Sequence, residues 1–152
     1  MPPPLRFALL GHPVKHSLSP VMHEASFRAL GLDAVYECID IAPKALGACL
    51  ATCRERGYAG LNVTVPHKTA VMAWMDRLDA SARLYGAVNT VRIDANGFTG
   101  ANTDAEGFLA DLAVNYRLSP EAARVMVLGC GGAGRALAIA CAHRGADEVV
   151  LA

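Results

Sequence analysis

Apolar runs of strand length alternate with helical stretches along almost the whole chain. The strand-like runs lie at 5–10, 34–41, 61–65, 87–93, 98–103, 124–128 and 148–151, and the helical stretches lie at 19–30, 43–56, 67–84, 105–115 and 132–143. Such alternation predicts an α/β fold with a mostly parallel sheet and helices on its faces. The turn sequence Asp94-Ala95-Asn96-Gly97 adds one antiparallel hairpin. The helical stretch 67–84 is expected to break near Leu78 and Asp79.

The composition excludes several classes of protein. Hydrophobic residues make up 53% of the 152 residues and charged residues 18%, so a disordered tail is excluded. Basic and acidic side chains balance at a net charge of zero without runs of like charge, which argues against a nucleic-acid partner. No window approaches the ~20 apolar residues of a membrane span, and Pro13 ends the first apolar run before it reaches signal-peptide length. We therefore expect a soluble, cytoplasmic protein.

The cysteines and histidines form no pattern typical of a metal site. Cys49 and Cys53 lie four residues apart on an expected helix, but no histidine stands at a matching spacing and no Cys-x-x-Cys pair occurs. We expect no bound metal, and we expect the five cysteines to be small buried hydrophobic residues. Surface or packing positions without a catalytic role are expected for His12, His16, His23, His67 and His143.

A glycine-rich turn joins the strand-like run 124–128 to the helical stretch 132–143. It reads Gly129-Cys130-Gly131-Gly132-Ala133-Gly134, a G-x-G-x-x-G spacing between strand and helix. In dinucleotide-binding proteins the first glycine permits the turn, the second lets a pyrophosphate approach, and the third allows close helix–strand packing. A tight strand-to-helix turn without a ligand is the plainer interpretation. The residue that selects NAD or NADP falls about 20 positions on, at the chain end, so the motif leaves that choice open.

Polar side chains gather where several expected strands end. Ser17 and Ser19 follow the first strand, and Asn62 and Thr64 share one face of the third by period-two alternation. Other polar groups near strand ends are Lys68, Asn89 and Asp104. If these ends meet at one sheet edge, hydroxyls, amides, one ammonium and one carboxylate converge near the glycine turn. Such a set suits a small, anionic, polyhydroxylated ligand.

Each of these residues also has a plainer explanation. Ser19 fits the N-cap of the first helix, and Asp104 could cap the helix that begins at Ala105. Lys68 could be a solvated lysine at a helix start. A solvent-facing strand surface or a satisfied buried amide would account for Asn62, Thr64 and Asn89.

A composition change near 116–123 divides the chain into two expected domains. Residues 1–116 would form a three-layer, mostly parallel α/β substrate domain, and residues 117–152 the first part of a Rossmann-type dinucleotide-binding domain. The second part holds a strand, a turn, a helix and the start of another strand, whereas a complete domain needs about five or six strands. We therefore expect a fragment, and an inactive piece or a ligand-binding module without redox activity stays open.

The chain resembles the N-terminal part of shikimate dehydrogenases, including quinate/shikimate dehydrogenase relatives. The resemblance covers essentially the whole chain through five motifs in the family's order: GHPVKHSLSP, NVTVPHK, GAVNT, NTDAEGF and GCGGAGRA. It implies reversible oxidation of shikimate to 3-dehydroshikimate with NADP, on the route to chorismate and the aromatic amino acids. A quinate-preferring, NAD-dependent enzyme is the alternative, and both a monomer and a homodimer are compatible with the sequence.

The resemblance also implies roles for individual residues. Lys68 matches the family's catalytic lysine, which carries the proton of the reacting hydroxyl, and Asp104 is expected to orient and support that hydroxyl. The substrate carboxylate would be held by Ser17 and Ser19, and the ring hydroxyls by Asn62, Thr64, Asn89 and Asp104. The turn from Gly129 to Gly134 matches the family's pyrophosphate loop, with glycine in the last place where serine or alanine is frequent.

Overall fold

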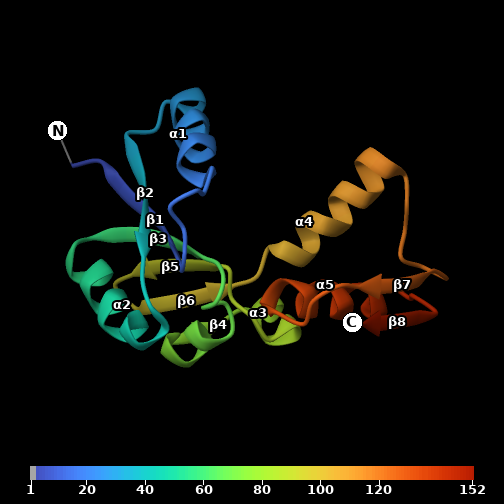
Figure 1. Ribbon diagram of the computed structural model, residues 1–152. Coiled ribbons are helices and arrows are strands. Elements are labelled where there is room, and N and C mark those ends of the chain that lie inside the picture. The colour runs from blue at the N-terminus through green and yellow to red at the C-terminus, as the bar shows by residue number, and fades with distance from the viewer. Residues whose placement is uncertain (1–2) are drawn as a thin grey trace.

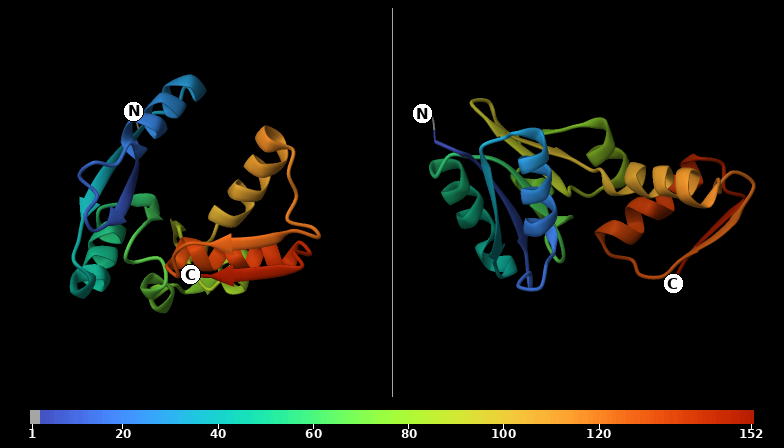
Figure 2. Two further views of the ribbon diagram at one scale, coloured as in Figure 1. Left: turned by 45° about the vertical axis from the view of Figure 1, so that its right-hand side comes forward. Right: turned by 90° about the horizontal axis from the view of Figure 1, so that it is seen from above.

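The structure, a computed structural model, describes residues 3–152 as two units (Figures 1 and 2). The first unit is built on a six-stranded sheet in the order β2-β1-β3-β5-β6-β4, and the second on the strand pair β7–β8. The strands of the first unit are β1 (Leu5–Gly11), β2 (Ala34–Asp40), β3 (Tyr58–Val63), β4 (Arg77–Leu78), β5 (Thr90–Asp94) and β6 (Gly97–Ala101). This α/β architecture agrees with the predicted fold class.

The strand directions agree with the predicted combination of parallel strands and an antiparallel hairpin. Strand β1 pairs in parallel with β2 and β3, whereas β5 pairs antiparallel with both β3 and β6. The hairpin turns at Ala95 and Asn96, so that Asp94 pairs with Gly97. The parallel strands β1, β2 and β3 therefore end at the same edge of the sheet, which is the edge that carries the polar motifs.

Helices cover both faces of the first sheet, which gives the unit three layers. Its helices and 3₁₀ turns are α1 (Ser19–Leu30), η1 (Pro43–Ala45), α2 (Leu46–Glu55), η2 (Ala70–Trp74) and α3 (Ala80–Tyr85). The main core lies on the α2 side and includes Leu10, Leu50, Val63 and Val91. A smaller cluster on the α1 side joins Leu9, Val14 and Tyr36, with Phe27 of α1 packed against it. Val63 and Val91 are almost completely buried. A shift of the strand pairing by one residue would turn these side chains to the other face of the sheet, so their burial fixes the register of the central strands.

The second unit follows a helix that connects the two sheets. That connecting helix is α4 (Asp104–Asp111), which continues into the π-helical turn η3 (Leu112–Tyr116), and the elements of the second unit are β7 (Arg124–Val127), α5 (Gly132–His143) and β8 (Glu148–Leu151). The helix α5 lies against α3 and α4 through a cluster of Tyr85, Ala105, Ala136 and Ala140. Small residues at 136 and 140 let the helices approach closely, so the glycine turn that precedes α5 is carried toward the first unit.

Two expectations about local structure were wrong. The stretch 67–84 breaks at Leu78 and Asp79 as expected, where Asp79 accepts a hydrogen bond from the backbone N–H of Ala82 at 2.8 Å and α3 begins, but before the break it forms only the 3₁₀ turn η2 and the short strand β4 instead of an α-helix. Ser19 is not the N-cap of α1, because Leu18 takes that position and Ser19 is the first helical residue. Its side chain instead pairs with Ser17.

Smaller differences concern exposure and strand limits. Strand β3 begins at Tyr58 rather than 61 and ends at Val63, so Val65 lies outside it and is exposed. Strand β5 begins only at Thr90. Cys130 is exposed in the glycine turn, whereas Cys53 and Cys141 are buried as expected.

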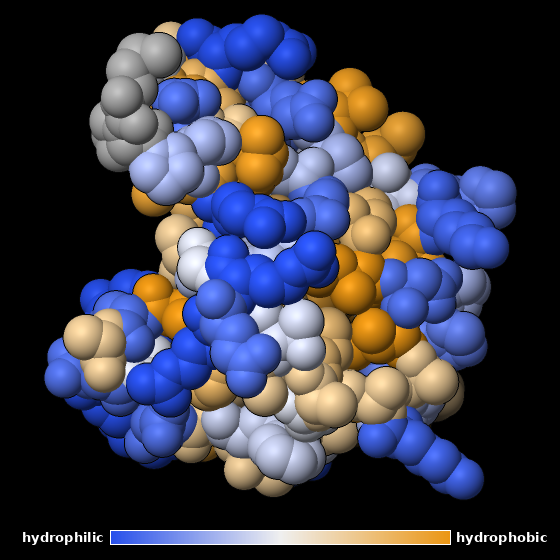
Figure 3. All heavy atoms as spheres, turned by 90° about the vertical axis from the view of Figure 1, so that its left-hand side faces the viewer, coloured by the Kyte–Doolittle hydropathy of each residue, from blue (hydrophilic) through white to orange (hydrophobic). Residues whose placement is uncertain are grey.

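Hydrophilic and hydrophobic residues are interspersed on the face drawn in Figure 3. Within residues 3–152, no helix combines the length and the apolar character that crossing a bilayer requires.

Candidate functional site

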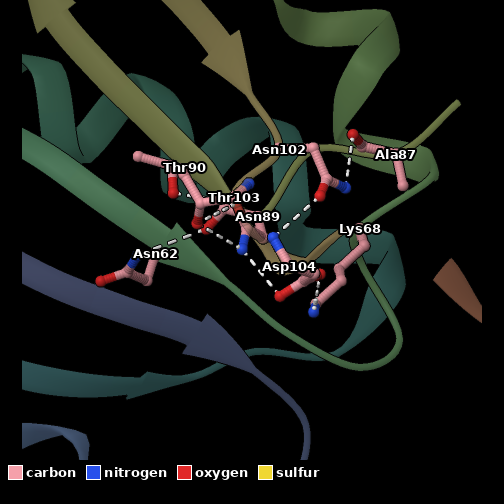
Figure 4. A network of polar contacts seen from close by, with 8 residues as sticks. All are labelled: Asn62, Lys68, Ala87, Asn89, Thr90, Asn102, Thr103 and Asp104. Atoms are coloured by element: carbon pink, nitrogen blue, oxygen red, sulfur yellow. Dashed lines mark hydrogen bonds and ion pairs between the residues drawn. The ribbon is translucent and has the colours of Figure 1, made fainter. Parts of the chain in front are cut away.

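The centre of the candidate site is an ion pair between Lys68 and Asp104 (Figure 4). The Lys68 Nζ atom lies 2.6 Å from Asp104 Oδ2, although the strands β4, β5 and β6 and the helix α3 separate the two residues along the chain. The Lys68 side chain is 13% exposed and that of Asp104 22% exposed. This partial burial strengthens the attraction between the two charges compared with a solvated pair. Lys68 is therefore not the solvated surface lysine of the plainer explanation.

Asn89 fixes the second oxygen of the Asp104 carboxylate. Its Nδ2 donates to Asp104 Oδ1 at 2.8 Å and to Thr103 Oγ1 at 3.0 Å, while its Oδ1 accepts from the backbone N–H of Thr103. Asp104 is the first residue of α4, but its carboxylate is held by side chains, and Thr103 occupies the N-cap. Capping alone therefore does not explain Asp104. Asn89 is a satisfied amide and at the same time part of the polar network.

Asn62 connects this network to the α1 side of the sheet. The Asn62 Nδ2 donates to the backbone carbonyl of Asn89 at 3.4 Å, and the Tyr36 hydroxyl donates to Asn62 Oδ1 at 2.8 Å. Burial raises the pKa of Tyr36 to about 12, so this hydroxyl keeps its proton well above neutral pH. The orientation of the Asn62 amide is consequently set from both sides.

Ser17 and Ser19 form a pair of hydroxyls at the start of α1. Ser17 Oγ donates to Ser19 Oγ at 3.0 Å and accepts from the backbone N–H of Ser19. Together with Thr64 they line a cavity of about 280 Å³ whose other walls are Leu9, Pro13, Val14 and His16. The structure therefore brings both serines and Thr64 to one hollow, as the sequence predicts.

The loop that carries the two serines is anchored at the ends of β1 and β2. Asp40 accepts from the backbone N–H of Val14 at 3.3 Å, and its Oδ1 lies 2.6 Å from His12 Nδ1. This hydrogen bond from His12 lowers the pKa of Asp40. At Gly11 a Cβ atom would collide with the side chains of Val14 and Thr64, so the close approach of this loop to Thr64 requires glycine.

The glycine turn has the geometry that a dinucleotide needs. Gly129 has a φ of +103°, which favours glycine, and a Cβ at Gly134 would collide with the backbone carbonyl of Gly129. A Cβ at Gly131 would meet nothing within 4 Å, so open space lies beside the backbone where the motif takes a pyrophosphate. The first turn of α5 also presents N–H groups without helical partners. The turn thus fits a dinucleotide phosphate.

A second cavity lies between this turn and Lys68. It measures about 260 Å³ and is lined by Val65, Pro66, Lys68, Thr69, Cys130, Gly131 and Gly132. Lys68 and the glycine turn therefore border the same space. A larger hollow between α4, the 118–121 segment and Arg144 contains none of the predicted site residues.

Three supporting residues were given no role by the sequence patterns. Tyr36 orients Asn62, and Thr103 bonds Asn89. Asn102 is 2% exposed; its Nδ2 donates to the Ala87 carbonyl at 3.1 Å and its Oδ1 accepts from the Asp104 N–H at 3.0 Å. Thr103 and Asn102 lie within the NTDAEGF motif and could have been found there. Tyr36 gives no such signal, because it lies in an ordinary apolar strand.

Comparisons with known proteins agree with this geometry. The family model described as shikimate dehydrogenase substrate binding domain matches residues 9–91. A curated relative from Methanopyrus kandleri, shikimate dehydrogenase (NADP(+)), is 49% identical over 144 residues, which are 95% of this chain and 50% of the relative. The chain spans about half the length of the curated relatives it matches.

Solved structures of related proteins have the same fold over almost the whole of this chain. The shikimate 5-dehydrogenase of Thermus thermophilus in complex with NADP(H) and shikimate superposes with a TM-score of 0.87 at 44% identity, covering 97% of this chain and 55% of that one. A 5-ketofructose reductase of Gluconobacter superposes with a TM-score of 0.84 at 36% identity, covering 97% and 53%. Because the family model matches more than half of its residues, this chain belongs to the shikimate dehydrogenase family.

Proposed function

We propose that this chain forms the substrate site and the first part of the cofactor site of an NADP-dependent shikimate dehydrogenase. The reaction is the reversible oxidation of shikimate to 3-dehydroshikimate. The observation that carries the proposal is the partly buried Lys68–Asp104 pair, which shares a network with Asn89 and whose lysine lines one cavity together with the glycine turn. Residues 1–116 would form the substrate domain and residues 117–152 the beginning of the dinucleotide domain.

The roles of the polar residues follow from their donors and acceptors. Ser17 and Ser19 offer two hydroxyls to the substrate carboxylate, and Thr64 lies in the same cavity. Asn62, Thr64, Asn89 and Asp104 would hold the ring hydroxyls. The carboxylate of Asp104 is an acceptor, so it orients a hydroxyl through that group's proton.

Lys68 would carry the proton of the reacting hydroxyl. Oxidation of an alcohol removes a proton from oxygen as well as a hydride from carbon, and the proton needs an acceptor within hydrogen-bond reach. The Lys68 Nζ atom lies beside Asp104, so one hydroxyl can contact both groups. Asp104 holds the amine in place and balances its charge when it is protonated.

NADP would occupy the turn from Gly129 to Gly134, including Cys130, Gly131, Gly132 and Ala133. When bound there it supplies the hydride acceptor. The chain itself contributes a glycine backbone that leaves space for the pyrophosphate and the N–H groups at the start of α5. The curated relatives carry NADP(+) in their names, which supports this cofactor over NAD.

The test of this function is turnover by the full-length protein. With shikimate and NADP, wild type should form NADPH, and Lys68→Ala should lower kcat by about 10²–10⁴-fold while changing the KM for shikimate much less. Lys44→Ala is the matched control, because Lys44 is exposed on η1. Near-full turnover by Lys68→Ala would disprove the proton role.

Substrate and cofactor alternatives are tested in the same assay. Faster turnover with quinate and NAD than with shikimate and NADP would replace the proposed activity by the quinate enzyme. Calorimetric binding of shikimate together with no turnover on any of these pairs would favour a binding module without redox chemistry.

A further inference from the structure

Three of the four glycines in the turn have a local reason to be glycine. Gly129 adopts a positive φ, Gly134 packs against the carbonyl of Gly129, and Gly131 borders open space where the motif takes a pyrophosphate. Gly132 is different. It is the first residue of α5, it is not one of the three motif glycines, and its φ lies outside the positive range. The requirements of the turn alone leave Gly132 unexplained.

The reason for Gly132 lies in the first unit. A Cβ atom at this position would sit 2.8 Å from Lys68 Cβ, 3.4 Å from Lys68 Cδ and 3.6 Å from Ala87 Cβ. Carbon atoms pack at about 3.5–4.0 Å. Lys68 Cβ is attached directly to the backbone, so rotation of the side chain cannot move it away. An alanine would therefore push the start of α5 and the Lys68 segment apart by roughly 1 Å.

Lys68 is held at three places along its length. Its backbone carbonyl accepts from the N–H of Val88 at 2.8 Å, its stem lies against Gly132, and its Nζ binds Asp104 at 2.6 Å. Only the contact with Gly132 belongs to the second unit. Both residues also line the 260 Å³ cavity.

We propose that Gly132 is a positioning residue that sets the distance between the Lys68 ammonium and the glycine turn. The absence of a side chain at 132 lets the start of α5 cover the Lys68 stem and direct Nζ toward Asp104. This inference rests on the proposed function of Lys68 as the proton carrier. It adds that the dinucleotide turn itself holds that lysine in place.

Amine labelling measures the position of Lys68 without any ligand. The chain has only three lysines, of which Lys15 and Lys44 are exposed and serve as internal references. Labelling with an acetylating reagent, read by peptide mass spectrometry, should be several-fold faster at Lys68 in Gly132→Ala than in wild type. Gly107→Ala is the control, because Gly107 lies on α4 and its Cβ would meet nothing within 4 Å. Unchanged labelling of Lys68 in folded Gly132→Ala would overturn the proposal.

A double-mutant cycle decides the case even if Gly132→Ala folds poorly. Lys68→Gly removes the Cβ atom that the alanine would meet, so Gly132→Ala should lower the melting temperature in wild type and change it little in the Lys68→Gly background. An equal decrease in melting temperature in both backgrounds would show that the alanine does not clash with the Lys68 side chain, and would overturn the proposal.

Kinetics separate positioning from cofactor binding in the full-length protein. Gly132→Ala should lower kcat by about ten- to a hundredfold, because displacement by roughly 1 Å disturbs the reacting geometry, with the KM for NADP changed less than threefold. Gly131→Ala, which points into the space for the pyrophosphate, should mainly raise the KM for NADP. A Gly132→Ala effect confined to that KM would contradict the proposal. Absence of turnover in wild type would instead refute the proposed function, and the labelling and the cycle would still decide this inference.

Discussion

The two units differ in how they bury their strands. In the first unit, β1, β3 and β5 contribute Leu10, Val63 and Val91 to a core closed by α2. In the second unit, Met126 on β7 is 66% exposed and Leu151 on β8 is 47% exposed. The second unit is instead fixed through α5, whose alanines pack on α3 and α4. The substrate side of the site is therefore supported by a sheet core, and the glycine turn by a helix contact.

The substrate half and the cofactor half of the site are thus held in place by different parts of the structure. Changes in the α2-side core should affect the stability of the first unit, whereas changes on α5 should displace the turn relative to Lys68.

The largest effect is expected in the core of the first unit. Leu50 is 1% exposed, so Leu50→Ala should lower the free energy of unfolding by about 2–5 kcal/mol through lost burial and a cavity. In this 152-residue chain, Met126→Ala, at an exposed position of β7, should change it by less than about 0.5 kcal/mol. Urea unfolding measures both, and equal losses would show that the units do not differ as described.

The packing of α5 against α3 and α4 should be sensitive to the size of the side chain at position 136. Ala136 is fully buried between α5 and the first unit, so Ala136→Leu should cost about 1–3 kcal/mol by overpacking. Hydrogen exchange should rise in α5 and in the glycine turn while β1 and β3 stay protected. Equal loss of protection in β1 would mean that the two units unfold together.

Alkaline pH should weaken the first unit through Tyr36. Burial raises the pKa of Tyr36 from 10.0 to about 12, so between these values the unfolded chain loses the phenolic proton more readily than the folded one. The contribution is complete below pH 10 and is lost as the pH rises through 12, with about 1 kcal/mol gone near pH 11. Urea unfolding at pH 9 and pH 11 should show this loss in wild type. Tyr36→Phe should lack that part of the pH dependence, and an identical dependence in the variant would contradict the assignment.

The smallest effect concerns thiol reactivity and leaves stability unchanged. Cys130 is exposed in the turn, while Cys53 and Cys141 are each 1% exposed. A thiol reagent should therefore modify Cys130 at least about tenfold faster than the two buried cysteines. Peptide mass spectrometry measures the order, and protection of Cys130 similar to that of Cys53 would show that the turn is more enclosed than the structure indicates.

Local signals predicted the elements whose limits depend on nearby residues. The hairpin follows from Asn96-Gly97, and α5 begins and ends where the sequence predicts because the glycine turn precedes it and Gly145 follows it. Strand β4 was missed because two residues carry no periodicity, and the strand exists only by pairing with β6. Ser19 was placed wrongly because a hydroxyl at a helix start can bond another side chain as well as the backbone.

The site was predictable as a set of residues rather than as an arrangement. The motifs indicate Lys68, Asn89 and Asp104, but no spacing says that an amine and a carboxylate 36 positions apart will meet at 2.6 Å. That contact depends on the pairing of β3 with β5 and of β5 with β6. The contact of Gly132 with Lys68 depends in addition on how α5 packs.

The Asp104 carboxylate has a donor on each oxygen before any ligand arrives, with Lys68 on Oδ2 and Asn89 on Oδ1. Its plane is consequently fixed from two different strand ends. The torsion angles of the Asp104 side chain are therefore already restricted before an alcohol binds. Binding of the alcohol then costs little additional side-chain entropy. Recognition at this carboxylate should then be governed by the stereochemistry of the ring, because the wrong epimer finds an acceptor that cannot turn to follow it.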